Sequence, residues 1–409
     1  MTGVRPIRRA TLVVLVLALV AALATPATDA TAAPSAPEIS ADSAIVVNAA
    51  SGDVLYARSP DRRRAIASTT KLMTALLTLE SVSLTDRFAA VRYQAAPAEV
   101  TIGLRPGERM TVRDLMRALL LPSANDAAAT LAHGVAGSRS RFVRMMNRRA
   151  RELGLDHTHY SNPVGLDVGR NYSSAADLVT LARQLRRSAF FRRTTNMPEA
   201  RLRSGDHPRT VVNRDDLVAK YRFVNGIKTG HTNKAGYVLV GSGTKHGVTV
   251  ISAVLGDPTE AARDADTLAL LDYGLAQLKR VTAVRRGERL GTAKVRYRES
   301  DTIPLVAGES VREVVSRGQR PRVSVDAPAV LGGPKPAGAR VGTAVVRVDG
   351  RTVARVPVRT GAKVPAVGFV DRVFGGVGTL TAIVILTVLV VATGSLLVAM
   401  ARRRRRQHA

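Results

Sequence analysis

Residues 67–77 read Ala67-Ser-Thr-Thr-Lys-Leu-Met-Thr-Ala-Leu-Leu77, a short polar segment that leads directly into an apolar pattern. The apolar spacing predicts a helix over residues 71–80, with Ser68 and Lys71 at positions i and i+3 of its first turn. Side chains three residues apart share one face of a helix, so the hydroxyl and the amine are predicted to be neighbours. A serine becomes a nucleophile when a base takes its proton, and a lysine can be that base once burial or a second cation lowers its pKa. The stretch therefore predicts Ser68 as nucleophile and Lys71 as its general base.

The pattern Ser-x-x-Lys is weak when taken alone. With 23 Ser and 9 Lys in the chain, it is expected about half a time by chance. A second copy, Ser242-Gly-Thr-Lys245, falls between two strand-like segments, where we expect a glycine-rich turn. A turn neither stacks the two side chains nor supplies a helix N-terminus. We therefore interpret the second copy as a chance occurrence.

Ser123-Ala-Asn125 follows Pro122, which ends a helix predicted over residues 111–120. A non-helical loop can point the hydroxyl and the amide the same way. Ser and Asn are also favoured helix N-caps. Taken alone, the segment is better explained as the cap of the helix predicted to begin at Asp126.

Lys228-Thr-Gly230 is rarer, because its residue counts predict about 0.06 chance occurrences in the chain. It lies on a strand predicted over residues 226–231. A cation beside a hydroxyl suits a substrate carboxylate. Gly230 removes a side chain where backbone must come close. The N–H of His231, which follows, could contribute to an oxyanion hole.

The order of predicted elements indicates two folded domains. Residues 41–280 begin with a hairpin at 43–48 and 54–57, continue with helices, and end with strands at 226–231, 236–241 and 248–255 closed by a helix at 262–278. A hairpin, helices and antiparallel strands in this order are typical of an α+β domain. From residue 281 to 366, short Val-rich stretches at 311–315, 323–325, 343–348 and 353–358, separated by Gly, Pro and Arg, predict a small all-β domain.

Both ends of the chain carry apolar segments. Arg5, Arg8 and Arg9 precede an apolar run at 10–24 and small residues, which predicts a secretory signal peptide over 1–32, followed by a linker at 33–40. An uncleaved anchor is the alternative, although the run is shorter than the roughly 20 residues of a span. Residues 373–401 are uncharged and predict a transmembrane helix. The basic tail at 402–409 is predicted to be cytoplasmic, which places the folded domains outside a single-pass anchor.

The net charge of +29 first suggests nucleic acid, but its placement argues otherwise. Three arginines of the leader and five of the tail account for eight charges, which leaves +21 on the exported part. The expected polyanions there are wall polymers and lipid headgroups. Aromatic residues make up 4% of the chain, which is too few for a surface that stacks nucleic-acid bases. The absence of Cys excludes a thiolate nucleophile and cysteine-based zinc. His157-Thr-His159 lacks a third ligand, so neither metal nor cofactor is expected.

The motifs Ser68-x-x-Lys71, Ser123-x-Asn125 and Lys228-Thr-Gly230 occur in this order along the chain. The residues that flank them are more specific than the motifs themselves. The flanks are Leu119-Leu-Leu-Pro-Ser-Ala-Asn-Asp-Ala-Ala128, Asn162-Pro-Val-Gly-Leu166 and Gly226-Ile-Lys-Thr-Gly-His-Thr232. Together they resemble the D-alanyl-D-alanine carboxypeptidases of the low-molecular-mass penicillin-binding type, over residues 41–280 and loosely beyond. The resemblance implies a DD-peptidase/β-lactamase-like domain with an antiparallel sheet and helices, a small β domain and a C-terminal membrane anchor.

The resemblance also implies a reaction. Ser68 attacks the carbonyl of the penultimate D-Ala of a peptidoglycan stem peptide and forms an acyl-enzyme, with Lys71 as general base. Water then hydrolyses the ester, and β-lactams acylate the same serine. The N–H groups of Ser68 and His231 form the oxyanion hole.

Further residues are implied to hold the substrate. Ser123 relays protons and Asn125 holds the peptide amide. Lys228 and Thr229, next to Gly230, receive the terminal carboxylate. Arg263 matches the family's carboxylate-contacting arginine by position, and a solvated charge at a helix start is an equal alternative.

The sequence departs from the pattern in places. The family often has Pro just before the nucleophile, where this chain has Arg64-Ala-Ile66, and the middle motif lacks the Ser-Asp-Asn of class A β-lactamases. No equivalent of their deacylating Glu stands between Asn125 and Lys228, because Glu152 lies in a carboxypeptidase-like context. A DD-endopeptidase, a β-lactamase and a non-catalytic penicillin- or peptidoglycan-binding scaffold remain as alternatives. The sequence carries no signal of the oligomeric state.

Overall fold

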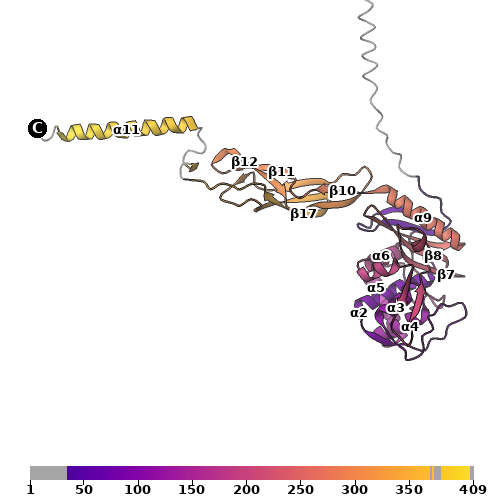
Figure 1. Ribbon diagram of the computed structural model, residues 1–409. Coiled ribbons are helices and arrows are strands. Elements are labelled where there is room, and N and C mark those ends of the chain that lie inside the picture. The colour runs from indigo at the N-terminus through magenta and orange to yellow at the C-terminus, as the bar shows by residue number, and fades with distance from the viewer. Residues whose placement is uncertain (1–34, 369–370, 373–378, 406–409) are drawn as a thin grey trace, which may run out of the picture. The chain divides into compact units, whose positions relative to one another are not determined.

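The structure is a computed structural model that describes residues 35–368, 371–372 and 379–405. The predicted signal peptide and the start of the predicted linker lie outside these residues. The described residues comprise an α+β domain, an all-β domain and a C-terminal apolar helix, which confirms the predicted fold class (Figure 1).

A five-stranded sheet forms the centre of the first domain, in the order β2-β1-β9-β8-β7. Every neighbouring pair is antiparallel. The predicted hairpin and three predicted strands are all present. The bounds are β1 Ser43–Asn48, β2 Val54–Arg58, β7 Val224–Thr232, β8 Gly236–Lys245 and β9 Val248–Asp257.

Alternating side chains of the sheet build two separate cores. Val46, Val250 and Val254 pack with Leu270 and Leu271 of helix α9 (Glu260–Gln277) on one face. The neighbouring positions along the same strands face the other way and pack against a group of helices (Figure 1). This period of two is what a strand buried on both faces requires. The helices of that group are α2 Lys71–Ser81, α3 Val112–Leu120, α4 Asn125–Ala136, α5 Arg139–Glu152 and α6 Ala175–Leu185.

Short elements complete the domain around these layers. A four-residue 3-10 helix, η1 (Ala67–Thr70), immediately precedes α2. Two small two-stranded sheets, β3 with β4 and β5 with β6, lie between helices of the domain. The remaining bounds are β3 Arg87–Ala89, β4 Arg109–Thr111, α7 Ala189–Thr195, β5 Glu199–Leu202, β6 Arg209–Val212 and α8 Leu217–Lys220.

The second domain is built from strands alone. A six-stranded sheet has the order β14-β16-β17-β12-β11-β15, and β10 pairs with β13. Sequence patterns predicted four of these strands and missed four, because β10, β11 and β12 mix polar and apolar residues and β15 has two residues. The bounds are β10 Leu278–Val284, β11 Arg289–Val295, β12 Arg298–Ala307, β13 Val311–Ser316, β14 Arg322–Asp326, β15 Val330–Leu331, β16 Arg340–Val348 and β17 Arg351–Thr360.

Helix α11 runs from Thr379 to Arg405. Its window Ile383–Arg403 has a mean hydropathy of 2.7, and none of it is buried in the protein. The helix is therefore long and apolar enough to cross a membrane. It continues into the arginines that were predicted to form a separate tail.

Candidate active site

Ser68 is the second residue of the 3-10 helix η1 and does not lie in the first turn of α2 as predicted. The side chains of Ser68 and Lys71 still lie on the same face, because residues i and i+3 eclipse one another in a 3-10 helix. Lys71 Nζ lies 3.0 Å from Ser68 Oγ. Ser68 lines a cavity of about 650 Å³. The structure thus brings the two predicted residues into direct contact at the surface of a hollow.

Lys71 is fully buried beneath this surface, with 0% of its surface exposed. Its Nζ donates a hydrogen bond to the backbone carbonyl of Val164 at 2.6 Å. Burial, with the charge of Lys228 as the next cause, lowers the pKa of Lys71 well below its ordinary value. A neutral amine at this position can accept the serine proton.

The carbonyl that holds Lys71 belongs to the segment Asn162-Pro-Val-Gly-Leu166. Asn162 Oδ1 accepts hydrogen bonds from the N–H groups of Val164, Gly165 and Leu166 at 3.2, 2.7 and 3.2 Å. Gly165 has a φ of +96°, and a Cβ there would lie 2.1 Å from the carbonyl oxygen of Ala67. The loop therefore packs backbone to backbone against the nucleophile turn, which only glycine allows.

Strand β7 forms the opposite wall of the nucleophile turn. A Cβ on Gly230 would lie 3.1 Å from the backbone nitrogen of Ser68, so a side chain at this position would press against the nucleophile turn. Thr229, Gly230 and His231 all line the cavity, and the His231 ring stacks on Tyr237 with centroids 4.1 Å apart. The amide of His231 thus follows directly after the residue in contact with Ser68.

Lys228 is the second buried lysine, with 1% of its surface exposed. Its Nζ donates to the carbonyl of Thr229 at 3.1 Å. Burial, followed by the charge of Arg214, lowers the pKa of Lys228 to about 7. The charge of Lys228 in turn contributes to the lowered pKa of Lys71, because two nearby cations disfavour each other's charged form.

Ser123, in the loop before α4, and Asn125, the first residue of α4, line the same cavity. Ser123 has a φ of +70°, and its Oγ is buried without a hydrogen-bond partner among the described residues. The N-cap of α4 is Ala124, and no side chain caps it, so the alternative of a helix cap is wrong. Asn125 Nδ2 donates instead to Glu99 Oε2 at 2.6 Å.

Arg263 lines the cavity and is 2% exposed, so the alternative of a solvated helix-start charge is wrong. Its guanidinium pairs with Asp264 at 2.6 Å and with Glu260 at 3.0 Å. The structure therefore places all nine predicted site residues in one region, with the two lysines buried beside the residues that line the hollow.

Sequence reasoning missed Glu99 and Arg214, two charged residues that line the cavity. Glu99 lines the cavity and accepts hydrogen bonds from Tyr93 and Asn125. Burial acts to raise the pKa of Glu99, but hydrogen bonds from Tyr93, Ala96 and Asn125 outweigh it and keep the pKa below its ordinary value. Arg214 also lines the cavity. Glu99 and Arg214 belong to irregular segments without motif or periodicity, so no sequence signal could have found them.

The second Ser-x-x-Lys copy lies inside strand β8 and not in the turn that we predicted. Ser242 is 0% exposed, and its Oγ donates to the carbonyl of Val250 at 3.1 Å. Lys245 pairs with Asp272 at 2.6 Å. The two side chains have separate structural partners, as expected of a chance match.

Comparisons with known proteins agree with this geometry. A family model described as D-alanyl-D-alanine carboxypeptidase matches residues 30–259, and one described as the C-terminal domain of penicillin-binding protein 5 matches residues 279–366. The carboxypeptidase DacF of Bacillus subtilis is 31% identical over 81% of this chain and 87% of its own length.

Solved structures give the same result. Penicillin-binding protein 5 from Haemophilus influenzae superposes with a TM-score of 0.58 and 26% identity, over 81% of this chain and 99% of its own. The Streptomyces K15 DD-transpeptidase superposes with a TM-score of 0.57 and 31% identity, over 59% of this chain and 100% of its own. With its paired Ser68 and Lys71, its sheet and its all-β second domain, the chain belongs to the D-alanyl-D-alanine carboxypeptidase family.

Proposed function

We propose that this chain is a membrane-anchored serine D-alanyl-D-alanine carboxypeptidase that removes the terminal D-Ala from peptidoglycan stem peptides. The observation that carries the proposal is the 3.0 Å contact between Ser68 Oγ and the buried amine of Lys71. An unprotonated amine at hydrogen-bond distance from a hydroxyl is the arrangement that activates a serine nucleophile. Family membership supplies the substrate class.

The first half of the reaction forms an ester. Ser68 Oγ attacks the carbonyl carbon of the penultimate D-Ala while its proton passes to Lys71. The backbone N–H groups of Ser68 and His231 stabilise the resulting oxyanion, which is the largest single contribution in most acyl transfers. Ser123 relays a proton to the amine of the departing D-Ala, and the peptide bond breaks.

Substrate orientation comes from the rest of the cavity. Lys228, Thr229 and Arg263 receive the terminal carboxylate, and Arg214 adds positive charge at the same wall. Asn125, fixed by its hydrogen bond to Glu99, presents its amide to the peptide backbone. A water molecule then attacks the ester with Lys71 again as base, which releases the shortened peptide and restores Ser68.

The apolar helix α11 supports membrane attachment of this enzyme. We propose a single span with the catalytic domain outside and Arg402–Arg406 on the cytoplasmic side, because basic residues stay on that side. Stem peptides, β-lactams and membrane lipid are the proposed partners. Protease digestion of intact cells should remove the folded domains, whereas an epitope tag fused after residue 409 should be protected inside the cell.

One experiment separates the proposed activity from its rivals. The full-length protein in a neutral detergent is incubated separately with a pentapeptide that ends in D-Ala-D-Ala, with a cross-linked dimer of stem peptides and with a labelled penicillin. A carboxypeptidase releases one D-Ala per peptide and keeps the penicillin label as a long-lived adduct. Fast penicillin hydrolysis would instead identify a β-lactamase, cleavage of cross-linked dimers alone an endopeptidase, and no D-Ala release a binding scaffold.

We expect Ser123→Ala to lower kcat/KM for the pentapeptide by about 10²-fold, the lower range for loss of a general acid–base group. The thermal midpoint should be unchanged or higher, because the buried Oγ has no partner among the described residues and its removal leaves nothing unsatisfied. Kinetics and thermal unfolding on the same preparation check both statements. A fall in the midpoint together with normal kinetics would make Ser123 a structural residue.

The pH profile of kcat/KM should be bell-shaped, with opposite contributions from the two lysines. Lys71 must be neutral, so activity rises as pH increases through its lowered pKa. Lys228 must be charged to hold the carboxylate, so activity falls as pH increases through a pKa of about 7. We expect Lys228→Arg to move the descending limb to higher pH, because a guanidinium stays protonated. An unchanged descending limb in this variant would contradict the assignment.

A further inference from the structure

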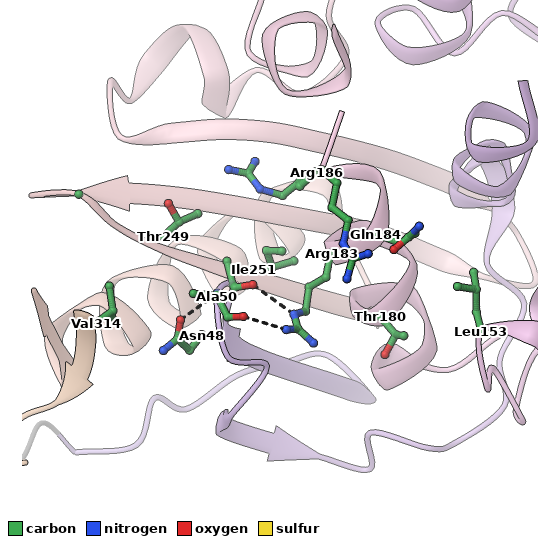
Figure 2. Close-up of a pocket in the computed structure, with 13 residues that line it drawn as sticks. Asn48, Ala50, Leu153, Thr180, Arg183, Gln184, Arg186, Thr249, Ile251 and Val314 are labelled. Atoms are coloured by element: carbon green, nitrogen blue, oxygen red, sulfur yellow. Dashed lines mark hydrogen bonds between the residues drawn. The ribbon is translucent and has the colours of Figure 1, made fainter. Parts of the chain in front are cut away.

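A second hollow lies in the catalytic domain, between the end of α6, the end of β1 with its following turn, and strand β9 (Figure 2). It shares no lining residue with the active-site cavity. Three arginines line it: Arg183, Arg186 and Arg187, all in or directly after the last turn of α6. We call it the arginine hollow.

The charges in the arginine hollow have no carboxylate to balance them. No Asp or Glu lines it among the residues that the structure describes. Arg183 donates from Nε to the carbonyl of Ala49 at 3.2 Å and from Nη2 to that of Ala50 at 3.1 Å (Figure 2). These neutral acceptors fix the direction of the guanidinium without neutralising it.

Arg186 contributes a buried guanidinium nitrogen to the hollow. Its Nη1 is buried and has no hydrogen-bond partner within the described part of the chain. Burial, with the nearby charge of Arg192 as the second cause, lowers the pKa of Arg186 to about 10. A guanidinium nitrogen that is removed from water and left unpaired destabilises the folded protein.

Other half-buried arginines of this domain have a carboxylate or an aromatic ring as a partner. Five that are at least half-buried meet a carboxylate within 3.1 Å, and Arg113 lies over the Phe190 ring. The five are Arg64, Arg117, Arg149, Arg209 and Arg263. Within the described part of this domain, the two half-buried arginines with neither a carboxylate nor an aromatic partner are Arg183 and Arg186, and they occur together in one hollow.

We propose that the arginine hollow binds the phosphate group of an anionic ligand, either a phosphodiester of a wall polymer or the headgroup of an anionic lipid. Planar guanidinium groups match phosphate oxygens two at a time, and three arginines line this hollow. The ligand would supply the acceptor that Arg186 Nη1 lacks. The hollow would then hold the enzyme against an anionic surface while the separate active-site cavity stays open to peptide.

The test is a titration of the full-length protein in neutral detergent with inorganic phosphate, at constant ionic strength with chloride as the balancing anion. We expect saturable binding, measured by calorimetry, that Arg186→Gln weakens by at least about tenfold. Arg144→Gln, an exposed arginine of α5 outside the hollow, is the matched control and should bind like the parent. D-Ala release should be the same in all three proteins, since the two cavities share no residue.

Stability gives a second readout. Without phosphate, Arg186→Gln should unfold at the parent's temperature or above it, because a buried unpaired charge has been removed. Phosphate should raise the midpoint of the parent and not that of the variant. If Arg186→Gln does not fold, the exposed Arg187→Gln replaces it with the same expected loss of binding.

Competition identifies the source of the phosphate. Soluble poly(glycerol phosphate) and micelles doped with phosphatidylglycerol are each tested for displacement of bound phosphate, against micelles doped with phosphatidylcholine. Displacement by the first indicates a wall polymer, and displacement by the second indicates lipid. Absence of saturable phosphate binding, equal binding by the parent and both variants, or displacement by neither competitor would overturn the proposal.

Discussion

Ser68→Ala is expected to abolish both D-Ala release and covalent labelling by penicillin, with a loss in kcat/KM of at least about 10⁴-fold. The variant keeps the cavity and Lys71 but has no oxygen with which to form the ester. Folding should be unaffected, because the removed hydroxyl lies at the surface of the hollow and its neighbour Lys71 retains the hydrogen bond to Val164. Rates on the pentapeptide and the mass of the penicillin adduct measure the two effects.

The chain offers a matched control in its second Ser-x-x-Lys copy. Ser242→Ala removes a serine that also lies three residues before a lysine but is inside β8. Its Oγ donates a hydrogen bond to the carbonyl of Val250. Its kinetics should stay within about twofold of the parent, as is usual away from a functional group. Penicillin bound at Ser242, or D-Ala release that survives Ser68→Ala, would show that the assignment is wrong.

Lys71→Gln is expected to lower the acylation rate by about 10³-fold. A glutamine amide can still donate to the carbonyl of Val164, but it cannot accept the proton of Ser68. The ascending limb of the pH profile should be absent in this variant, because that limb reports the ionisation of Lys71. Stopped-flow measurement of penicillin acylation across pH separates this result from a simple loss of folding.

Lys245→Gln is the corresponding control. Lys245 is exposed and pairs with Asp272 on the surface, where an ion pair contributes about 0–1 kcal/mol to stability. Its acylation rate and pH profile should match those of the parent. A Lys71→Gln protein that keeps the ascending limb would mean that another group is the base.

The sequence predicted the centre of the site well because its chemistry is local. Ser68 and Lys71 are three residues apart, and the glycine of Lys228-Thr-Gly230 does what the motif implied, since it lies against the backbone of Ser68. The helix predicted over residues 71–80 is present as α2, Lys71–Ser81. Patterns within one element are set by that element's own geometry, so one sequence is enough to find them.

Contacts between distant segments could not be predicted in this way. Glu99 and Arg214 reach the cavity only because the chain folds back there, and nothing in their own surroundings marks them. The burial of Arg263 depends on neighbours that no local pattern specifies. The same holds for the second Ser-x-x-Lys copy, whose strand continues further than its glycines suggested.

The contact of the nucleophile turn with Gly165 and Gly230 has a consequence for biosynthesis. Ser68 and Lys71 leave the ribosome early, but the two backbones that flank their turn lie about 95 and 160 residues later in the chain. A nascent chain that stops before β7 contains the nucleophile and its base and still lacks one wall of the site. Labelling by penicillin would therefore report completed folding of the whole domain, and the enzyme would stay unreactive until its last central strands are in place.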